Sequence, residues 1–347
     1  MPPLVSILVP AYNAESSLAA TLESALAQTW PNKEIIVVDD GSKDGTLAVA
    51  NGFRSRGVIV HQQSNQGAAA ARNKAFALSK GHYIQWLDAD DLLSSDKIAL
   101  QIAALPNGCS PRTLLSSGWA YFIYRPHKAS FAATPLWSDL SPAEWLFRKL
   151  DLNLHMQTAT WLVSRELTEA AGLWDTRLLG DDDGEYFCRV LLASDGVRFV
   201  PGAKVYYRRS LGSLSFIGRS DPKIQSQFLS MKIHIDHLRS LEDSPRVRSA
   251  CIKYLQRYLL YFYPERSDIV REARELAASL GGELGAPVLP WKYNWIQKLF
   301  GWNLGKRAWV CLPRFRESFV RRWDKLLFSL ENHRRSRPEV SPTPASS

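Results

Sequence analysis

Three carboxylates follow directly on an apolar run near residue 85. Residues 83–87 read Tyr-Ile-Gln-Trp-Leu, which is typical of a buried strand, and Asp88, Asp90 and Asp91 come next. Carboxylates this close repel one another unless they are solvated or paired with a positive charge. Mg²⁺ or Mn²⁺ would suit them, because these ions take carboxylate oxygens and keep coordination places for phosphate. The alternative is a polar loop, with Asp96 capping the next helix.

A second acidic cluster occupies residues 181–185. It contains Asp181, Asp182, Asp183 and Glu185. Mutual repulsion should raise the pKa of at least one of these carboxyl groups, and a raised pKa suits a general base that deprotonates a hydroxyl nucleophile. The alternative is an acid-rich helix start that the helix dipole favours, and this is compatible with catalysis.

Alternating strands and helices must position both clusters. The sequence predicts apolar strands at 5–9, 34–38, 58–60 and 83–87, with helices at about 15–28, 44–55 and from residue 68. This order predicts an α/β fold with a mainly parallel sheet. The carboxyl ends of such strands are where ligands bind, so the residues that follow them should gather at one edge.

Four motifs stand at those strand ends in a fixed order. They read Pro10-Ala-Tyr-Asn13, Val38-Asp-Asp-Gly-Ser42, Asn65-Gln-Gly67 with Ala71-Arg-Asn73, and Asp88-Ala-Asp-Asp91. Together they resemble the motifs of family 2 glycosyltransferases over about residues 3–215. The resemblance implies a GT-A fold, which is a Rossmann-like domain that binds nucleotide sugars. A dinucleotide-binding Rossmann protein is disfavoured, because no glycine-rich phosphate turn follows the first strand.

The resemblance also implies roles for individual residues. Tyr12 would stack on the nucleobase, Asp40 would accept the imide N–H of uracil or thymine, and Asp90 would hold Mn²⁺ or Mg²⁺. Arg72 would face the base or the diphosphate, and Asp88 would reach the ribose hydroxyls. The complete expected donor-binding set is Pro10, Tyr12, Asn13, Asp40, Arg72, Asp88 and Asp90.

The general base is expected within residues 180–189. Relatives usually read Glu-Asp here, followed by an acidic position and then an arginine. Counting back from Arg189 gives Asp183 as the base, with Asp182 in place of the glutamate. The shorter side chain leaves open which of the two is the base. A base on one face of the sugar and a metal-held leaving group on the other imply inversion at the anomeric carbon.

The middle of the chain is expected to present the acceptor. The sequence predicts a strand at 158–163, a helix from 165 to 171, and another helix that begins at Ser141-Pro142. Trp137 and Trp145 either line an acceptor groove or pack in the core.

Charge divides the 347 residues into two parts. Residues 1–215 hold 20 Lys and Arg against 21 Asp and Glu, whereas residues 216–347 hold 23 against 13. We therefore expect a GT-A domain at 1–215, a helical region at 216–335 and a disordered Ser- and Pro-rich tail at 336–347. Within the helical region, the helices up to residue 280 carry no evident catalytic group.

The segment 288–337 is basic and rich in tryptophan. It holds 12 Lys and Arg, only 3 Asp and Glu, and five tryptophans. This composition favours an anionic membrane surface as partner. The alternative is that the tryptophans cover the core. Nucleic acid is not expected as a partner, because no recognised module accompanies the charge.

Targeting signals give the expected location. The start of the chain does not resemble a signal peptide, and no apolar run is long enough to span a membrane. The four widely spaced cysteines suit a reducing compartment as small core residues. We expect a cytoplasmic protein that associates peripherally with the inner face of the membrane.

The sequence therefore predicts an inverting glycosyltransferase. The donor would be a UDP- or dTDP-sugar, and the acceptor a saccharide or a lipid-linked molecule. Two alternatives remain open. One is an inactive nucleotide-sugar-binding or scaffold protein, which the intact Asp88, Asp90 and Asp183 disfavour. The other is a different nucleotide-dependent transferase, which should carry a basic phosphate-binding loop after the first strand.

Overall fold

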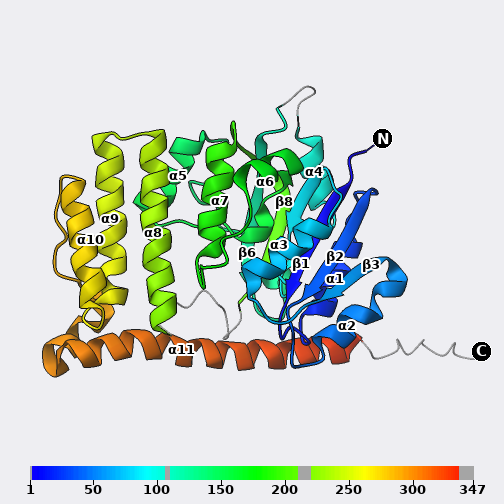
Figure 1. Ribbon diagram of the computed structural model, residues 1–347. Coiled ribbons are helices and arrows are strands. Elements are labelled where there is room, and N and C mark those ends of the chain that lie inside the picture. The colour runs from blue at the N-terminus through cyan, green and yellow to red at the C-terminus, as the bar shows by residue number, and fades with distance from the viewer. Residues whose placement is uncertain (1, 106–109, 210–219, 336–347) are drawn as a thin grey trace, which may run out of the picture. The chain divides into compact units, whose positions relative to one another are not determined.

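The computed structural model describes residues 2–105, 110–209 and 220–335, and its chain forms two compact units (Figure 1). The larger unit comprises residues 1–120, 130–207 and 213–288. The smaller comprises residues 121–129, 208–212 and 289–347. The expected disordered tail at 336–347 lies outside the described residues.

A five-stranded sheet forms the centre of the larger unit. Its strand order is β3-β2-β1-β4-β7. The strands are β1 (Val5–Ala11), β2 (Lys33–Asp39), β3 (Val58–Gln62), β4 (Tyr83–Trp86) and β7 (Val163–Ser164). The first four run parallel and β7 is antiparallel to β4. The predicted α/β class and mainly parallel sheet are confirmed.

Alternate residues of each strand supply the two faces of this sheet. In β1, Ile7 and Val9 belong to one core cluster, whereas Leu8 belongs to the other. All three are fully buried, because helices cover both faces, and this explains why the strands read as continuous apolar runs.

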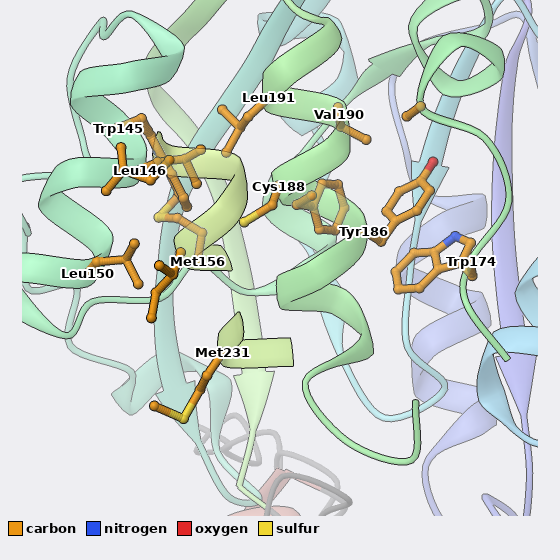
Figure 2. Packing of buried hydrophobic residues seen from close by; sticks show 14 of the residues in the cluster. Trp145, Leu146, Leu150, Met156, Trp174, Tyr186, Cys188, Val190, Leu191 and Met231 are labelled. Carbon is orange, nitrogen blue, oxygen red and sulfur yellow. The ribbon is translucent and has the colours of Figure 1, made fainter. Parts of the chain in front are cut away.

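Helices from both sides complete these two cores. Residues of α1 (Leu18–Leu26) and α2 (Thr46–Gly52) pack into the cluster that contains Ile7. Residues of α3 (Ala68–Leu78), α6 (Arg165–Ala171) and α7 (Asp182–Ala193) pack into the cluster that contains Leu8. Figure 2 shows part of the cluster that contains Leu8. In this cluster the Trp174 ring stacks on Tyr186 of α7, with 4.1 Å between ring centroids.

A second, three-stranded sheet is formed by residues that follow β4. It has the order β5-β8-β6, formed by β5 (Leu92–Leu93), β8 (Gly196–Arg208) and β6 (Thr113–Phe122). The helix α4 (Lys97–Ala103) begins after Asp96, which occupies its N-cap position, although the Asp96 side chain makes no capping hydrogen bond.

The chain between β6 and α6 differs in one place from expectation. The predicted strand at 158–163 is wrong, because residues 158–160 form a 3₁₀ turn, η3 (Thr158–Thr160), and only Val163–Ser164 pair as β7. The helix α5 (Pro142–Leu152) begins as predicted, with the Ser141 hydroxyl accepting from the Glu144 N–H. Trp145 is buried in the core, and Trp137 packs against it.

Three further helices belong to the larger unit. They are α8 (Asp221–Leu241), α9 (Pro245–Phe262) and α10 (Ser267–Ser279), and they share the core cluster of α5 and α7. The compact unit thus runs past residue 215, where the sequence places a domain boundary. Cys188 and Cys251 are buried free thiols as expected, whereas Cys311 is exposed.

The smaller unit is built on one long helix. After the short turn η5 (Trp291–Tyr293), α11 (Asn294–Arg335) runs for 42 residues and kinks at Gly301, whose φ of 83° is non-helical. Trp302 and Trp309 are half-buried, whereas Trp291, Trp295 and Trp323 are exposed. Among the described residues, none of the helices has the length and apolar character needed to cross a membrane.

Candidate active site

The ends of β1, β2 and β4 lie at the same edge of the sheet. The backbone continues to pair just past the strands: the Asp40 N–H donates to the Ala11 carbonyl at 2.8 Å, and the Leu87 N–H donates to the Leu8 carbonyl at 3.0 Å. The motifs that follow these strands therefore start from neighbouring positions, as the sequence predicts.

Tyr12 and Asn13 follow β1 and behave differently. Tyr12 is 47% exposed, so its side chain can be reached by a ligand. Asn13 is instead engaged with the loop after β2. Its N–H donates to the Ser42 hydroxyl at 3.0 Å, and its side-chain oxygen accepts from the Lys43 N–H at 2.8 Å. Asn13 thus orders the loop that carries Asp40.

Asp40 is buried and receives three hydrogen bonds. Its Oδ1 accepts from the Gln63 side chain at 2.8 Å and from the Gln66 N–H at 2.9 Å. Among the residues that the structure describes, its Oδ2 accepts one hydrogen bond, from the Gly67 N–H at 2.8 Å. Because each carboxylate oxygen can accept two hydrogen bonds, Oδ2 keeps capacity for one more. These bonds hold the Asn65-Gln-Gly67 motif against the end of β2.

Arg72 connects the two acidic clusters. It lies on α3 and is 6% exposed. Its Nη2 donates to Asp88 at 2.8 Å and its Nη1 donates to Asp182 at 2.7 Å. Its guanidinium also lies over the Trp174 ring, 4.3 Å from the ring centroid. A planar guanidinium can satisfy two carboxylates in this way, whereas an ammonium group offers no such fixed fork.

Asp183 differs from Asp182 in its partners. Asp182 pairs with Arg72, whereas the side-chain hydrogen bond of Asp183 comes from the Thr158 hydroxyl at a long 3.4 Å. Burial, together with the charges of Asp182 and Asp181, raises the pKa of Asp183 to about 7. Burial also raises the pKa of Asp182, although Arg72 opposes this shift. Asp183 can therefore exchange a proton near neutral pH.

The carboxylates after β4 offer oxygens of the kind that a divalent metal ion binds. Asp88 and Asp90 are half-buried, and Asp91 is fully buried and accepts from the Gln157 side chain. Within the described residues, no group of three or more His, Cys, Asp or Glu side chains is arranged to hold a metal ion. Mg²⁺ usually binds through one or two carboxylates together with substrate phosphates, so Asp88 and Asp90 fit an ion that arrives with its nucleotide.

Two sets of supporting residues were not identified from the sequence. Asn73 forms a reciprocal pair with Trp174, accepting from its N–H at 2.8 Å and donating to its carbonyl at 3.0 Å. Asn73 belongs to the same sequence motif as Arg72, and this position could have identified it from the sequence. These bonds hold the Trp174 ring in place beneath the Arg72 guanidinium.

The second set lies on α8, where no catalytic group was expected. The Ser230 hydroxyl donates to Asp181 at 2.6 Å, and the Gln227 amide donates to the same oxygen at 3.3 Å. The Ser226 hydroxyl accepts from the Leu179 N–H at 2.9 Å. The signal that could have identified these residues is that Ser226, Gln227 and Ser230 are polar side chains close together in an amphipathic helix. Through these bonds α8 fixes the loop that leads into Asp182 and Asp183.

The model of glycosyl transferase family 2 matches residues 6–162. The chain contains a family 2 glycosyltransferase domain. A UDP-Glc:alpha-D-GlcNAc-diphosphoundecaprenol beta-1,3-glucosyltransferase, WfaP of Escherichia coli, is 46% identical over 100 residues, which cover 28% of this chain and 40% of that protein. The putative teichuronic acid biosynthesis glycosyltransferase TuaG of Bacillus subtilis is 41% identical over 103 residues, which cover 29% of this chain and 41% of that protein.

The chain is similar over a longer stretch to an uncharacterized glycosyltransferase of Rickettsia typhi. It is 31% identical over 198 residues, which cover 55% of this chain and 60% of that protein. The chain thus matches about 40 to 60% of the length of these relatives.

Solved structures share the fold at low sequence identity. TarS of S. aureus, residues 1–349 in complex with UDP, aligns with a TM-score of 0.56 at 16% identity, covering 80% of this chain and 88% of that one. The same region of TarS in complex with UDP-GlcNAc aligns with a TM-score of 0.55 at 17% identity, covering 80% and 92%. The predicted GT-A fold is confirmed.

Proposed function

We propose that this chain is an inverting glycosyltransferase that moves a sugar from a UDP- or dTDP-sugar to a saccharide or lipid-linked acceptor. The observation that carries the proposal is the double contact of Arg72 with Asp88 and Asp182. It joins the end of β4, where the donor would bind, to the start of α7, where the base would stand. Neither cluster alone would distinguish a transferase from a polar loop.

Asp183 is the proposed general base. The pKa of Asp183 is raised to about 7, whereas the neighbouring Asp182 forms an ion pair with Arg72. Asp183 would accept the proton of the acceptor hydroxyl as the hydroxyl oxygen bonds to the anomeric carbon and the bond from that carbon to the diphosphate oxygen breaks. Attack from the side opposite the diphosphate inverts the anomeric configuration.

Asp90 would hold the proposed Mn²⁺ or Mg²⁺, and Asp88 beside it would reach the ribose hydroxyls. Such an ion would neutralise the charge that develops on the leaving diphosphate, so that no acid would be needed to protonate it. Other parts of the chain position these two carboxylates. Arg72 orients Asp88, and the β4 strand fixes where both carboxylates begin.

Asp40 and Tyr12 support a donor with uracil or thymine as its base. The imide N–H of those bases would match the acceptor capacity left on Asp40 Oδ2, and the accessible Tyr12 ring would stack on the base. The relative from E. coli is named for UDP-Glc, and the TarS complexes contain UDP or UDP-GlcNAc. The sugar itself is not specified by these contacts.

The proposed acceptor is presented at the cytoplasmic face of a membrane. The name of the E. coli relative specifies a diphosphoundecaprenol-linked acceptor, which is a lipid. A peripheral enzyme with a basic surface would meet such an acceptor at the headgroup region.

A nucleotide-sugar screen tests the proposal. The full chain would be titrated with UDP-, dTDP-, GDP- and CDP-sugars in the presence of Mn²⁺, and the donors that bind would be assayed for transfer. We expect binding of a UDP- or dTDP-sugar and an inverted product with a GlcNAc-diphospho-lipid or saccharide acceptor. Absence of binding to all of these donors would refute the proposal, as would a product that retains the anomeric configuration.

A further inference from the structure

The helix α11 leaves a long apolar stripe open to solvent. The stripe consists of Leu312, Phe315, Phe319, Trp323, Leu326 and Leu330, and the side chains are between 51 and 74% exposed. Successive members are three or four residues apart, so at 3.6 residues per turn they lie on one face of the helix. A continuous apolar face of this length is uncommon on a protein that remains free in water.

The opposite face of α11 carries the acidic residues. Glu317, Asp324 and Glu331 are the only acidic residues in 288–335, and they are spaced by seven residues. Asp324 and Glu331 each pair with Arg125 at 2.8 Å. Glu317 lies 3.8 Å from Arg209. All three acids are thus turned toward residues 121–129 and 208–209 of the same unit.

Aromatic contacts fix the same orientation of the helix. The Tyr124 and Phe328 rings lie 6.1 Å apart, and the Arg321 side chain donates to the Tyr124 hydroxyl at 3.2 Å. Arg321 and Phe328 stand on the face of α11 that carries the acids. The helix is therefore held by its polar face, and the apolar stripe points away from its partner segments.

Basic residues border the stripe. Arg316 and Arg322 flank it on its two sides, and Arg307 and Lys325 lie further round the helix. All four are exposed, and none forms an ion pair among the described residues. Long basic side chains can lie along apolar surface and keep their charged ends in the headgroup layer.

We propose that this face of α11 is the membrane-binding surface, and that it inserts its apolar stripe into the headgroup region of an anionic bilayer. This inference deepens the proposed function, because it identifies the surface on which a lipid-linked acceptor would be met. The exposed face combines an apolar stripe, basic borders and no acid, which complements anionic lipid.

A second copy of the chain fits this face less well. A paired coiled coil needs apolar residues at two positions of a strict seven-residue repeat. Leu312, Phe319, Trp323, Leu326 and Leu330 fit such a repeat, but the same repeat places Arg316 in the seam and leaves Phe315 outside it. The stripe instead follows the straight period of 3.6, which suits a flat surface.

Vesicle co-sedimentation of the full chain tests the inference. Wild-type protein would be mixed with phosphatidylcholine vesicles with and without phosphatidylglycerol. We expect binding only to the anionic vesicles, and weaker binding as salt is raised. The double variant Phe315→Ser with Phe319→Ser should reduce partitioning at least about tenfold, because each removed ring contributes to membrane partitioning. The double variant Arg316→Gln with Arg322→Gln should reduce both binding and its salt dependence.

Two controls separate the surface from the active site. Ile59→Ser removes an exposed apolar side chain from β3 and should leave vesicle binding unchanged. All the α11 variants should keep the thermal stability and UDP affinity of the wild type, so that failure of the proposed function would be seen separately as absent nucleotide binding. The inference is overturned if the wild-type protein does not bind anionic vesicles. It is also overturned if the wild type forms a dimer that Phe315→Ser with Phe319→Ser dissociates.

Discussion

Replacing Asp183 by asparagine should remove the general base and leave the donor site intact. The substitution keeps the shape of the side chain, while Asp182 and Arg72 keep their contact at 2.7 Å. The variant should melt no lower than the wild type. Burial and repulsion raise the pKa of Asp183 to about 7 and so disfavour its charged form in the folded state, and a neutral amide relieves this cost.

The expected loss of activity follows from the role of a general base. Such a base contributes about 10² to 10⁴ in rate, so kcat should fall by that factor while donor affinity stays within about threefold. This corresponds to about 3 to 5.5 kcal/mol in the activation barrier.

The pH dependence provides an independent measure. As the proposed general base, Asp183 would act only when deprotonated, so activity should rise with pH through about 7. For a single group with that pKa, the active fraction is about 9% at pH 6 and about 91% at pH 8, which gives roughly a tenfold rise. The Asp183→Asn variant should lack this step in its residual activity.

The assay compares initial rates of sugar transfer with nucleotide binding by calorimetry. Asp195→Asn is the matched control, because Asp195 is an exposed carboxylate just beyond the other end of α7. The reasoning is refuted if Asp182→Asn is inactive while Asp183→Asn is active, because the base would then be one position earlier. It also fails if Asp183→Asn retains the wild-type pH profile.

Three further predictions concern the metal, the base of the donor and the role of α8. Asp90→Ala should abolish both transfer and metal-dependent binding of nucleoside diphosphate in calorimetry, and full activity of that variant in chelator would exclude the assigned metal site. UDP and dTDP should bind more tightly than GDP and CDP, because Asp40 matches an imide N–H, and the reverse order in a competition assay would contradict this. Ser230→Ala should lower the free energy of unfolding by about 1–3 kcal/mol, because it removes a bond to a charged Asp181, whereas the exposed Ser240→Ala on the same helix should have little effect. Equal losses in urea denaturation would rule out the proposed support by α8.

Much of the fold was available from local sequence. The strands around Ile7, Ile36 and Ile84 are continuous apolar runs, because helices cover both faces of the sheet, and their spacing fixed a parallel α/β order. The failure at 158–163 has a local cause. Thr158 and Thr160 have strand-forming side chains, but the Gln157 side chain and carbonyl accept from Ala159 and Thr160 and so form a turn.

The sequence by itself determined which residue types could do the chemistry and at which edge they would gather, because parallel strands carry their carboxyl ends to one side. Only the tertiary structure decided which of those residues pair with one another. Arg72 is 110 positions from Asp182 in the chain, so their pairing depends on α3 and α7 packing together. That pairing leaves Asp183 as the carboxylate with a pKa near 7. The orientation of α11 was likewise set by Arg125, some 200 residues earlier, because it binds the acidic face of the helix and leaves the apolar stripe exposed.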